Sequence, residues 1–217
     1  ILNMARPGAE RVFVGKTAGH HILPQEEICR LLVDKAREGK FVARLKGGDP
    51  LVFGRGGEEI EALLAAGVAV EIVPGVTAAL GAAASFGFPL THREHAQSCV
   101  FVTGHLKNHR VDLDWDALAR PGQTVVIYMG VSGLDEISAR LQAAGLPGDT
   151  PAALIHRATC PEQRAYPGTL GALPEIARER RLKPPALIVI GGVISLLQDA
   201  SHAGRQATDR RTGDGKQ

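Results

Sequence analysis

The segment of this sequence best suited to chemistry is a glycine-rich turn. It carries one acid and has cations on both sides. The run Arg44-Leu-Lys-Gly-Gly-Asp-Pro-Leu-Val-Phe-Gly-Arg-Gly-Gly-Glu-Glu59 follows a short apolar segment, 41–45. Glycines after a strand let a ligand approach the backbone, and such turns bind small molecules in α/β folds. The turn lacks a Gly-Lys-Ser/Thr, and its acids would repel phosphate. It therefore predicts a site for a hydroxyl-bearing or cationic ligand at Asp49, with an ordinary turn and capping acids as the alternative.

The composition excludes several classes of protein. The chain has 217 residues, 44% hydrophobic and 22% charged, with a net charge of +2, which suits one large or two small domains. Aromatic residues make up 4%, without basic-aromatic interleaving, so we expect no nucleic-acid partner. The three cysteines form no disulfide pattern and the histidines have no metal-ligand spacing, so no metal is predicted. No signal peptide or long apolar run occurs, so we expect a cytoplasmic protein without a membrane partner.

Strand-like and helix-like patterns alternate along the chain, which predicts an α/β fold with a parallel-type sheet. The predicted strands are 11–14, 41–45, 68–73, 99–103, 124–128, 152–155 and 186–190. The predicted helices are 24–38, 58–66, 77–85, 112–119, 132–144 and 170–180. The polar stretch 199–217 has no periodicity, so we expect a disordered tail.

Several further motifs stand in a fixed order around the glycine turn. They are Val14-Gly-Lys-Thr-Ala-Gly-His20, Val73-Pro-Gly-Val-Thr-Ala-Ala79, Pro89-Leu-Thr-His-Arg93, Thr103-Gly-His-Leu-Lys107, Tyr128-Met-Gly130 and Pro185-Ala-Leu-Ile188. Together they resemble the signature of the uroporphyrinogen-III C-methyltransferases, in the tetrapyrrole methylase family. The resemblance extends from about Ala5 to Leu197. The glycine turn alone would indicate only the wider superfamily, whereas the Thr-His-Arg and Gly-His-Leu-Lys motifs are more specific.

The resemblance implies a two-lobed tetrapyrrole methylase fold, the class III S-adenosylmethionine (SAM) methyltransferase fold, with SAM in the cleft between the lobes. We expect an N-terminal α/β lobe at 1–95 and a C-terminal α/β lobe at 96–198. The implied reaction is SAM-dependent methylation of two ring carbons of uroporphyrinogen III. Its product, precorrin-2, feeds sirohaem and cobalamin synthesis. A homodimer is implied in the same way.

The resemblance also assigns residues to SAM, whose activated methyl group needs alignment more than covalent help. They are Gly47, Gly48, Asp49, Val52, Thr77, Ala78, Met129, Ala158, Ala186 and Leu187. Ala158 falls where the family usually has glycine, which weakens that one contact. From the residues alone, Val52, Met129 and Ala158 would be interpreted as apolar core residues.

Uroporphyrinogen III is rich in carboxylates, so its site needs cations. The candidates are Arg44, Arg55, Arg93, His105 and Lys107. Each charge could instead be a solvated surface residue, an alternative that is weakest for Arg44 and Arg55 because they flank the glycine turn. Lys16 matches the family's proton donor. Its action near neutral pH would need a pKa lowered by burial or by nearby cations, and the alternative is a solvent-exposed lysine.

Family members have further chain before the part that matches here. It comprises a strand, a Gly-x-Gly-x-Gly-Asp-Pro turn, a helix and a strand ending in Tyr-Asp-x-Leu-Val-Ser, none of which occurs in this sequence. We therefore expect a segment of roughly 30 residues, the size of a βαβ unit, to be absent. It would carry part of the SAM site and the family's proton acceptor. The chain alone is then expected to be weakly active or inactive, and prone to aggregate.

Two other functions remain open from the sequence. The first is a sibling methylase that acts on a later corrin intermediate, against which the Thr-His-Arg and Gly-His-Leu-Lys motifs argue. The second is a truncated module that binds SAM or a tetrapyrrole without turnover. An enzyme should release S-adenosylhomocysteine when it is given uroporphyrinogen III, whereas a binding module should not.

Overall fold

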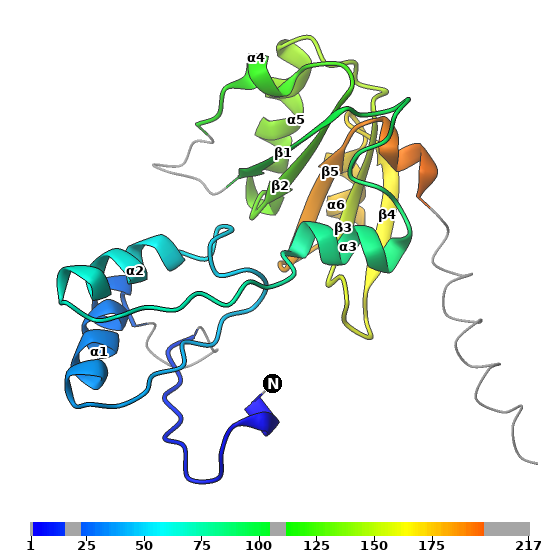
Figure 1. Cartoon of the computed structure of the whole chain (residues 1–217). Helices are drawn as coiled ribbons and strands as arrows, with labels where there is room; N and C mark the ends of the chain where they lie inside the picture. The colour runs from blue at the N-terminus through cyan, green and yellow to red at the C-terminus, as the bar shows by residue number, and fades with distance from the viewer. Residues whose placement is uncertain (1, 16–22, 105–111, 198–217) are drawn as a thin grey trace, which may run out of the picture. The chain divides into compact units, whose positions relative to one another are not determined.

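The structure is a computed structural model that describes residues 2–15, 23–104 and 112–197. The chain divides into two compact units, Ile1–Gly75 and Val76–Gln217. In Figure 1 the first unit runs from blue to cyan and the second from green to orange. The predicted lobe boundary near residue 95 stays a prediction, and the predicted tail, 199–217, lies outside the described residues.

The first unit is built on two helices that contact each other, α1 (Gln25–Arg37) and α2 (Gly56–Ala65), with a short 3-10 helix, η1 (Leu2–Met4). Both helices confirm the sequence prediction. Helix α1 has acids in its first turn and bases in its last turn, which matches the helix dipole. It buries Ile28 and Leu32, which lie four residues apart on one face.

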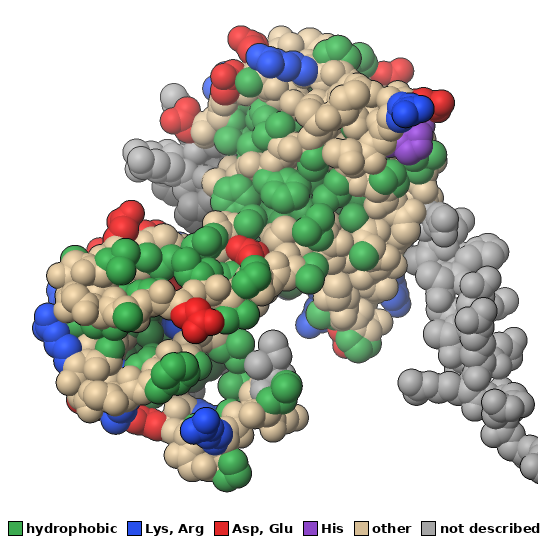
Figure 2. All heavy atoms as spheres, in the orientation of Figure 1, with side chains coloured by type: hydrophobic (Ala, Val, Ile, Leu, Met, Phe, Trp, Pro, Cys, Tyr) green, Lys and Arg blue, Asp and Glu red, His purple; other side chains and the backbone are tan. Residues whose placement is uncertain are grey.

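The three strands predicted in the first unit are wrong. Among the described residues, 11–14 and 41–45 make no backbone–backbone hydrogen bond, and in 68–73 only Val68 makes one, to Leu63 at the end of α2; none of these segments is a strand. Most of their apolar side chains stay exposed, with Phe41 at 98% and Val73 at 72%. Figure 2 shows apolar side chains on the surface of this unit. The apolar pattern marks segments able to pair, but a strand also needs a neighbour that satisfies its backbone groups.

The second unit contains a five-stranded sheet in the order β1-β2-β5-β3-β4. The strands are β1 (Ser98–Thr103), β2 (Gln123–Tyr128), β3 (Pro151–His156), β4 (Arg164–Thr169) and β5 (Ala186–Ile190). Four of them confirm predicted strands. The apolar runs of β2, β3 and β5 are buried, as expected of central strands covered on both faces.

Two features of this sheet differ from the prediction. The sheet is mixed, because only β1 and β2 run parallel, whereas the β2–β5, β5–β3 and β3–β4 pairs are antiparallel. An alternation of strands and helices does not fix the direction in which each strand returns. Strand β4 was missed because Pro167 and Gly168 disfavour a strand. They are tolerated because β4 lies at the edge of the sheet.

Helices cover both faces of the sheet (Figure 1). On one face, α5 (Leu134–Ala143), α6 (Leu173–Glu179) and the short α4 (Trp115–Leu118) pack into the core. Helix α3 (Ala78–Phe86) lies on the face to which Tyr128 points, since the Tyr128 hydroxyl reaches its first turn. Two 3-10 helices, η2 (Val131–Gly133) and η3 (Gly192–Leu196), follow β2 and β5. Within the described part of the chain, no helix is long and apolar enough to span a bilayer.

We predict that the core of the second unit dominates its stability. Leu154 is 0% exposed at the centre of β3 and belongs to the same core cluster as Leu173 and Ile188. Leu154→Ala should lower the free energy of unfolding by about 2–5 kcal/mol, because it removes buried methyl groups and leaves a cavity. Leu80→Ala is the control, since Leu80 is 51% exposed on α3. Equal effects of the two changes in denaturant unfolding would contradict the placement of Leu154.

Candidate functional site

The glycine turn of the first unit is shaped by the Asp49 carboxylate. Its Oδ1 accepts the Leu51 N–H at 2.9 Å, and its Oδ2 accepts the Gly75 N–H at 3.0 Å. These backbone hydrogen bonds, from Gly75 first and then Leu51, lower the pKa of Asp49. Asp49 therefore stays ionised at neutral pH and joins the turn to the segment that precedes the second unit.

Glycine is required at two positions around this carboxylate. Gly48 has φ = 73°, in the left-handed region that side chains disfavour. A side chain on Gly75 would overlap the carbonyl of Gly48. The structure thus brings Gly48 and Asp49 against Gly75, a contact between two of the sequence motifs.

A buried acid in the first turn of α2 forms ion pairs with the cations that precede the glycine turn. Glu59 is 4% exposed, and its Oε1 accepts hydrogen bonds from Lys46 at 2.9 Å, Gln25 at 3.0 Å and Arg44 at 3.2 Å. Burial raises the pKa of Glu59, but the hydrogen bonds from Lys46 and Gln25 and the charges of Arg44 and Lys46 outweigh it, so the net pKa is lowered. Arg44, predicted to bind substrate, is therefore already paired inside the unit.

Arg55 is placed differently from Arg44. It has φ = 58° at the residue before α2 and forms a two-pronged ion pair with Glu58, with distances of 2.8 and 2.6 Å. The side chains of Arg55 and Glu58 are 56% and 52% exposed. An exposed pair of this kind contributes little to stability, so the guanidinium remains accessible to another carboxylate.

In the second unit, six predicted SAM residues lie at one end of the sheet. The end of β2 leads to Met129, which has φ = 54°, and Tyr128 is paired across the ladder with Leu187 of β5. The Tyr128 hydroxyl lies 2.7 Å from Thr77 Oγ1 and accepts the Ala79 N–H at 3.0 Å. Thr77 and Ala78 at the start of α3 are thereby held beside the ends of β2 and β5.

The loop after β3 reaches the same end of the sheet. The Arg157 N–H donates to the Pro185 carbonyl at 3.1 Å, next to Ala186, and a side chain on Gly81 of α3 would meet the Thr159 methyl group. Ala158, between Arg157 and Thr159, does not share their positive φ values of 48° and 69°. An alanine where the family usually has glycine is therefore free of backbone strain here.

The segment before β1 gathers three groups that could bind a metal ion. His92, Glu94 and His95 place ligand atoms within 4.8 Å of one another. However, His92 Nδ1 accepts the Glu94 N–H at 3.2 Å, so the neutral imidazole carries its proton on Nε2 and offers no free lone pair while this bond is kept. The absence of a metal stays a prediction. The neighbouring Arg93 is exposed.

Three predicted site residues, Lys16, His105 and Lys107, lie outside the described residues. Two important residues were missed by the sequence interpretation. The sequence predicts Glu59 only as a capping acid, although three donors that precede it, Gln25, Arg44 and Lys46, could have indicated a buried partner. Tyr128 was noted only as part of the Tyr-Met-Gly motif, and nothing in the sequence signals its contacts with Thr77 and Ala79.

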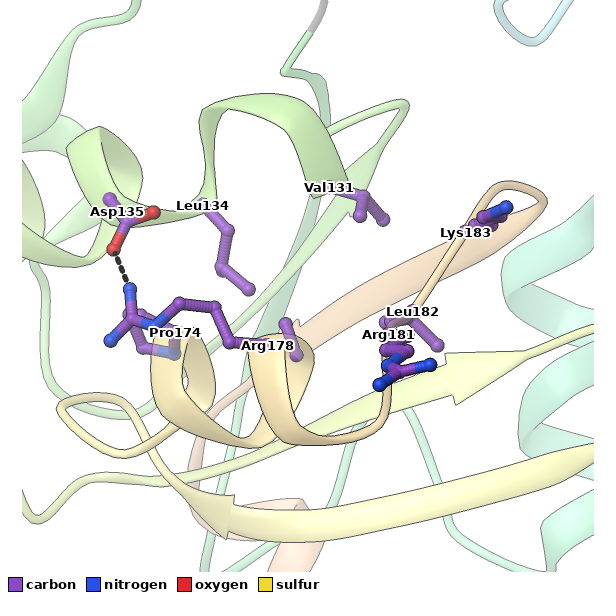
Figure 3. A pocket seen from close by; sticks show the side chains of 9 residues that line it. Val131, Leu134, Asp135, Pro174, Arg178, Arg181, Leu182 and Lys183 are labelled. Carbon is purple, nitrogen blue, oxygen red and sulfur yellow. Dashed lines mark hydrogen bonds and ion pairs between the residues drawn. The ribbon is translucent and has the colours of Figure 1, made fainter.

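A separate cavity of about 360 Å³ lies on the opposite side of the sheet from α3, where η2 and α5 meet α6 (Figure 3). Its walls combine Val131, Leu134 and Leu182 with the charged residues Asp135 and Arg178. Arg178 is paired with Asp135 at 2.8 Å, as the dashed line in Figure 3 marks. No predicted site residue lines this cavity.

The sequence matches the family model of the tetrapyrrole (corrin/porphyrin) methylases over residues 2–174. A sirohaem synthase of Nitrosomonas europaea is 56% identical over 198 residues, which cover 91% of this chain and 42% of that protein. A sirohaem synthase of Gluconacetobacter diazotrophicus is 53% identical over 195 residues, 89% of this chain and again 42% of that protein. The chain thus spans less than half the length of these relatives.

Solved structures agree with the sequence matches. A uroporphyrin-III C-methyltransferase from Thermus thermophilus, complexed with S-adenosylhomocysteine, has 41% identity and a TM-score of 0.73, covering 88% of this chain and 80% of that chain. A cobalt precorrin-4 methyltransferase has 29% identity and a TM-score of 0.75, covering 89% of this chain and 79% of that chain. The predicted α/β tetrapyrrole methylase fold is thereby confirmed.

We predict that Glu59 makes the first unit sensitive to acid. Because its pKa is lowered in the folded state, its contribution is complete above the unfolded value of about 4.3 and is lost as the pH falls through the lower folded value. Glu59→Gln should destabilise the protein by about 1–3 kcal/mol at pH 7 and flatten the loss of stability below pH 5. Glu61→Gln, at an exposed position of the same helix, is the control. Parallel pH profiles for wild type and Glu59→Gln would refute this role.

Proposed function

The chain belongs to the tetrapyrrole methylase family, and we propose that it methylates two ring carbons of uroporphyrinogen III with SAM as methyl donor, giving precorrin-2. The observation that carries this proposal is the convergence of Thr77, Met129 and Leu187 at one end of the sheet through the Tyr128 hydroxyl and the β2–β5 ladder. The Thermus thermophilus relative holds S-adenosylhomocysteine, the product that SAM becomes after methyl transfer.

In the proposed reaction a ring carbon attacks the methyl group in line with the sulfur. The new carbon–carbon bond forms as the methyl–sulfur bond breaks, its electron pair stays on sulfur, and the ring then loses a proton. The protein must align the two reactants, which needs rigid contacts. We propose that the ten residues assigned to SAM above provide them, and that Lys16 takes part in the proton transfer.

We propose that cations hold the substrate's carboxylates. Arg55 and Arg93 are exposed and can form new pairs, whereas Arg44 is already paired with Glu59. His105 and Lys107 complete the proposed set. From the resemblance of the motifs, we further propose that the protein is a cytoplasmic homodimer and that precorrin-2 serves sirohaem synthesis, with cobalamin synthesis as a second branch.

The test is a methylation assay with SAM carrying a labelled methyl group and uroporphyrinogen III, followed by identification of the product. We expect a doubly methylated product and release of S-adenosylhomocysteine. Labelling only of a later corrin intermediate would identify a sibling methylase. Binding of SAM with no S-adenosylhomocysteine released in the presence of any tetrapyrrole would identify a binding module.

Asp49 is predicted to be essential for SAM binding. Its carboxylate fixes the glycine turn through the N–H groups of Leu51 and Gly75, so Asp49→Ala should release the turn. The affinity for SAM should fall at least about tenfold, which corresponds to about 1.4 kcal/mol. Asp34→Ala, an exposed change on α1, should leave the affinity unchanged. Unchanged SAM affinity of Asp49→Ala in calorimetry would exclude this role.

Arg55 is predicted to bind substrate rather than SAM. Arg55→Ala should raise the Michaelis constant for uroporphyrinogen III about tenfold and leave SAM affinity nearly intact, because a charge-assisted pair is lost. Arg55→Lys should restore only part of the affinity, since a two-pronged guanidinium becomes a point charge. Glu58→Gln removes the internal competitor and should not raise that constant. If Arg55→Ala weakens only SAM binding, the residue belongs to the cofactor site.

A further inference from the structure

The start of helix α3 is capped by a side chain from another element. Thr77 stands at the N-cap position, but its side chain makes no capping hydrogen bond. Instead, the Ala79 N–H, one of the first-turn donors that no helical carbonyl can satisfy, donates to the Tyr128 hydroxyl at 3.0 Å. Thr77 Oγ1 lies 2.7 Å from the same hydroxyl, and either group can be the donor.

These three groups are shielded from water. Ala79 is 1% exposed, Thr77 6% and Tyr128 8%. A buried N–H that loses its acceptor costs more than an exposed one, because water cannot replace the lost partner. The Tyr128 ring also packs against Phe101, with 5.9 Å between the ring centroids, so a phenylalanine at position 128 would keep the ring contact and remove only the hydroxyl.

The position of Tyr128 in the sheet connects the contacts of its hydroxyl to two strand ends. It is the last residue of β2, so its backbone leads directly to Met129, which adopts φ = 54°. Its partner in the antiparallel ladder is Leu187 of β5. One hydroxyl therefore links the helix start at Thr77 to the ends of two neighbouring strands.

We infer that Tyr128 is a positioning residue, whose hydroxyl sets the start of α3 at Thr77 and Ala78 against Met129 and Leu187 in the geometry that SAM needs. This inference rests on the proposed function. Tyr128 acts through its neighbours, because its side chain is buried and hydrogen-bonded to Thr77 and Ala79. Its removal should therefore affect the cofactor far more than the tetrapyrrole.

The test compares Tyr128→Phe with wild type in calorimetric titrations with S-adenosylhomocysteine and in steady-state kinetics. We expect the affinity to fall about tenfold, because the Ala79 N–H and the Thr77 hydroxyl lose their shared partner. The Michaelis constant for SAM should rise, whereas that for uroporphyrinogen III should stay within twofold. Thr77→Val should resemble Tyr128→Phe.

Ser138→Ala is the matched control, since it also removes a buried hydrogen bond of the second unit. The Ser138 hydroxyl donates to the Leu170 carbonyl at 2.8 Å, and neither residue is a predicted SAM residue. Its thermal unfolding should shift as much as that of Tyr128→Phe, with affinity for S-adenosylhomocysteine within twofold of wild type. The double variant Tyr128→Phe/Thr77→Val should bind no worse than the weaker single variant, because the two changes break one interaction.

Three results would overturn the inference. The first is wild-type affinity in Tyr128→Phe, and the second is an equal loss of affinity in Ser138→Ala, which would make the effect one of stability. The third is strict additivity of the two single variants in the double variant. A wild-type protein that does not bind S-adenosylhomocysteine would instead refute the proposed function, and with it this inference.

Discussion

Strand β5 is hydrogen-bonded along both of its edges, to β2 and to β3, and the placement of the candidate residues in the second unit depends on this double pairing. Its side chains are buried on both faces of the sheet, so a shift of one residue would exchange them between two packed faces and disrupt the packing on each. The register is therefore fixed. Because both pairs are antiparallel, the start of β5 lies beside the ends of β2 and β3, where the connecting segments emerge.

The first unit is organised by carboxylates instead of a sheet. Glu59 is buried with cations and an amide around it, which fixes the chain before the glycine turn onto α2. Within the described part of the chain, Asp49 accepts hydrogen bonds from backbone N–H groups, and these fix the turn itself. One acid thus neutralises charge and the other satisfies backbone donors. Both have lowered pKa values, which keeps both ionised where a neutral acid would accept these bonds less well.

The sequence predicted the elements whose side-chain pattern is distinctive over a short stretch of chain. The periodicities of α1, α2 and α5 and the apolar run of β5 identify those elements to within a few residues. Strand direction could not be predicted in the same way, because it depends on which neighbours pair. Strand β4 could not be predicted because its proline and glycine disfavour a strand. The apolar segments of the first unit resemble strands in sequence, but a pattern of side chains carries no information about backbone partners.

In the candidate site too, local features could be predicted from the sequence and long-range contacts could not. The glycine turn and Asp49 could be recognised because glycine and a lone acid leave a mark at fixed spacing in the sequence. Long-range contacts leave no such mark. The Tyr128 hydroxyl reaches residues about fifty positions earlier in the chain, at Thr77 and Ala79, and a tyrosine in an apolar strand is indistinguishable in sequence from an ordinary core residue.

Whether a cation can bind a carboxylate-rich substrate depends on the acid with which it is already paired. Arg44, Lys46 and Arg55 look equivalent in the sequence, but the first two share the buried Glu59, while Arg55 pairs with the exposed Glu58. Separating a buried pair leaves an uncompensated charge and is strongly unfavourable. An exposed pair contributes about 0–1 kcal/mol, so an incoming carboxylate can replace Glu58 at little cost. Among the three cations that the structure describes around the glycine turn, Arg55 is therefore the one free to exchange partners, and Arg44 and Lys46 stabilise the segment that precedes it.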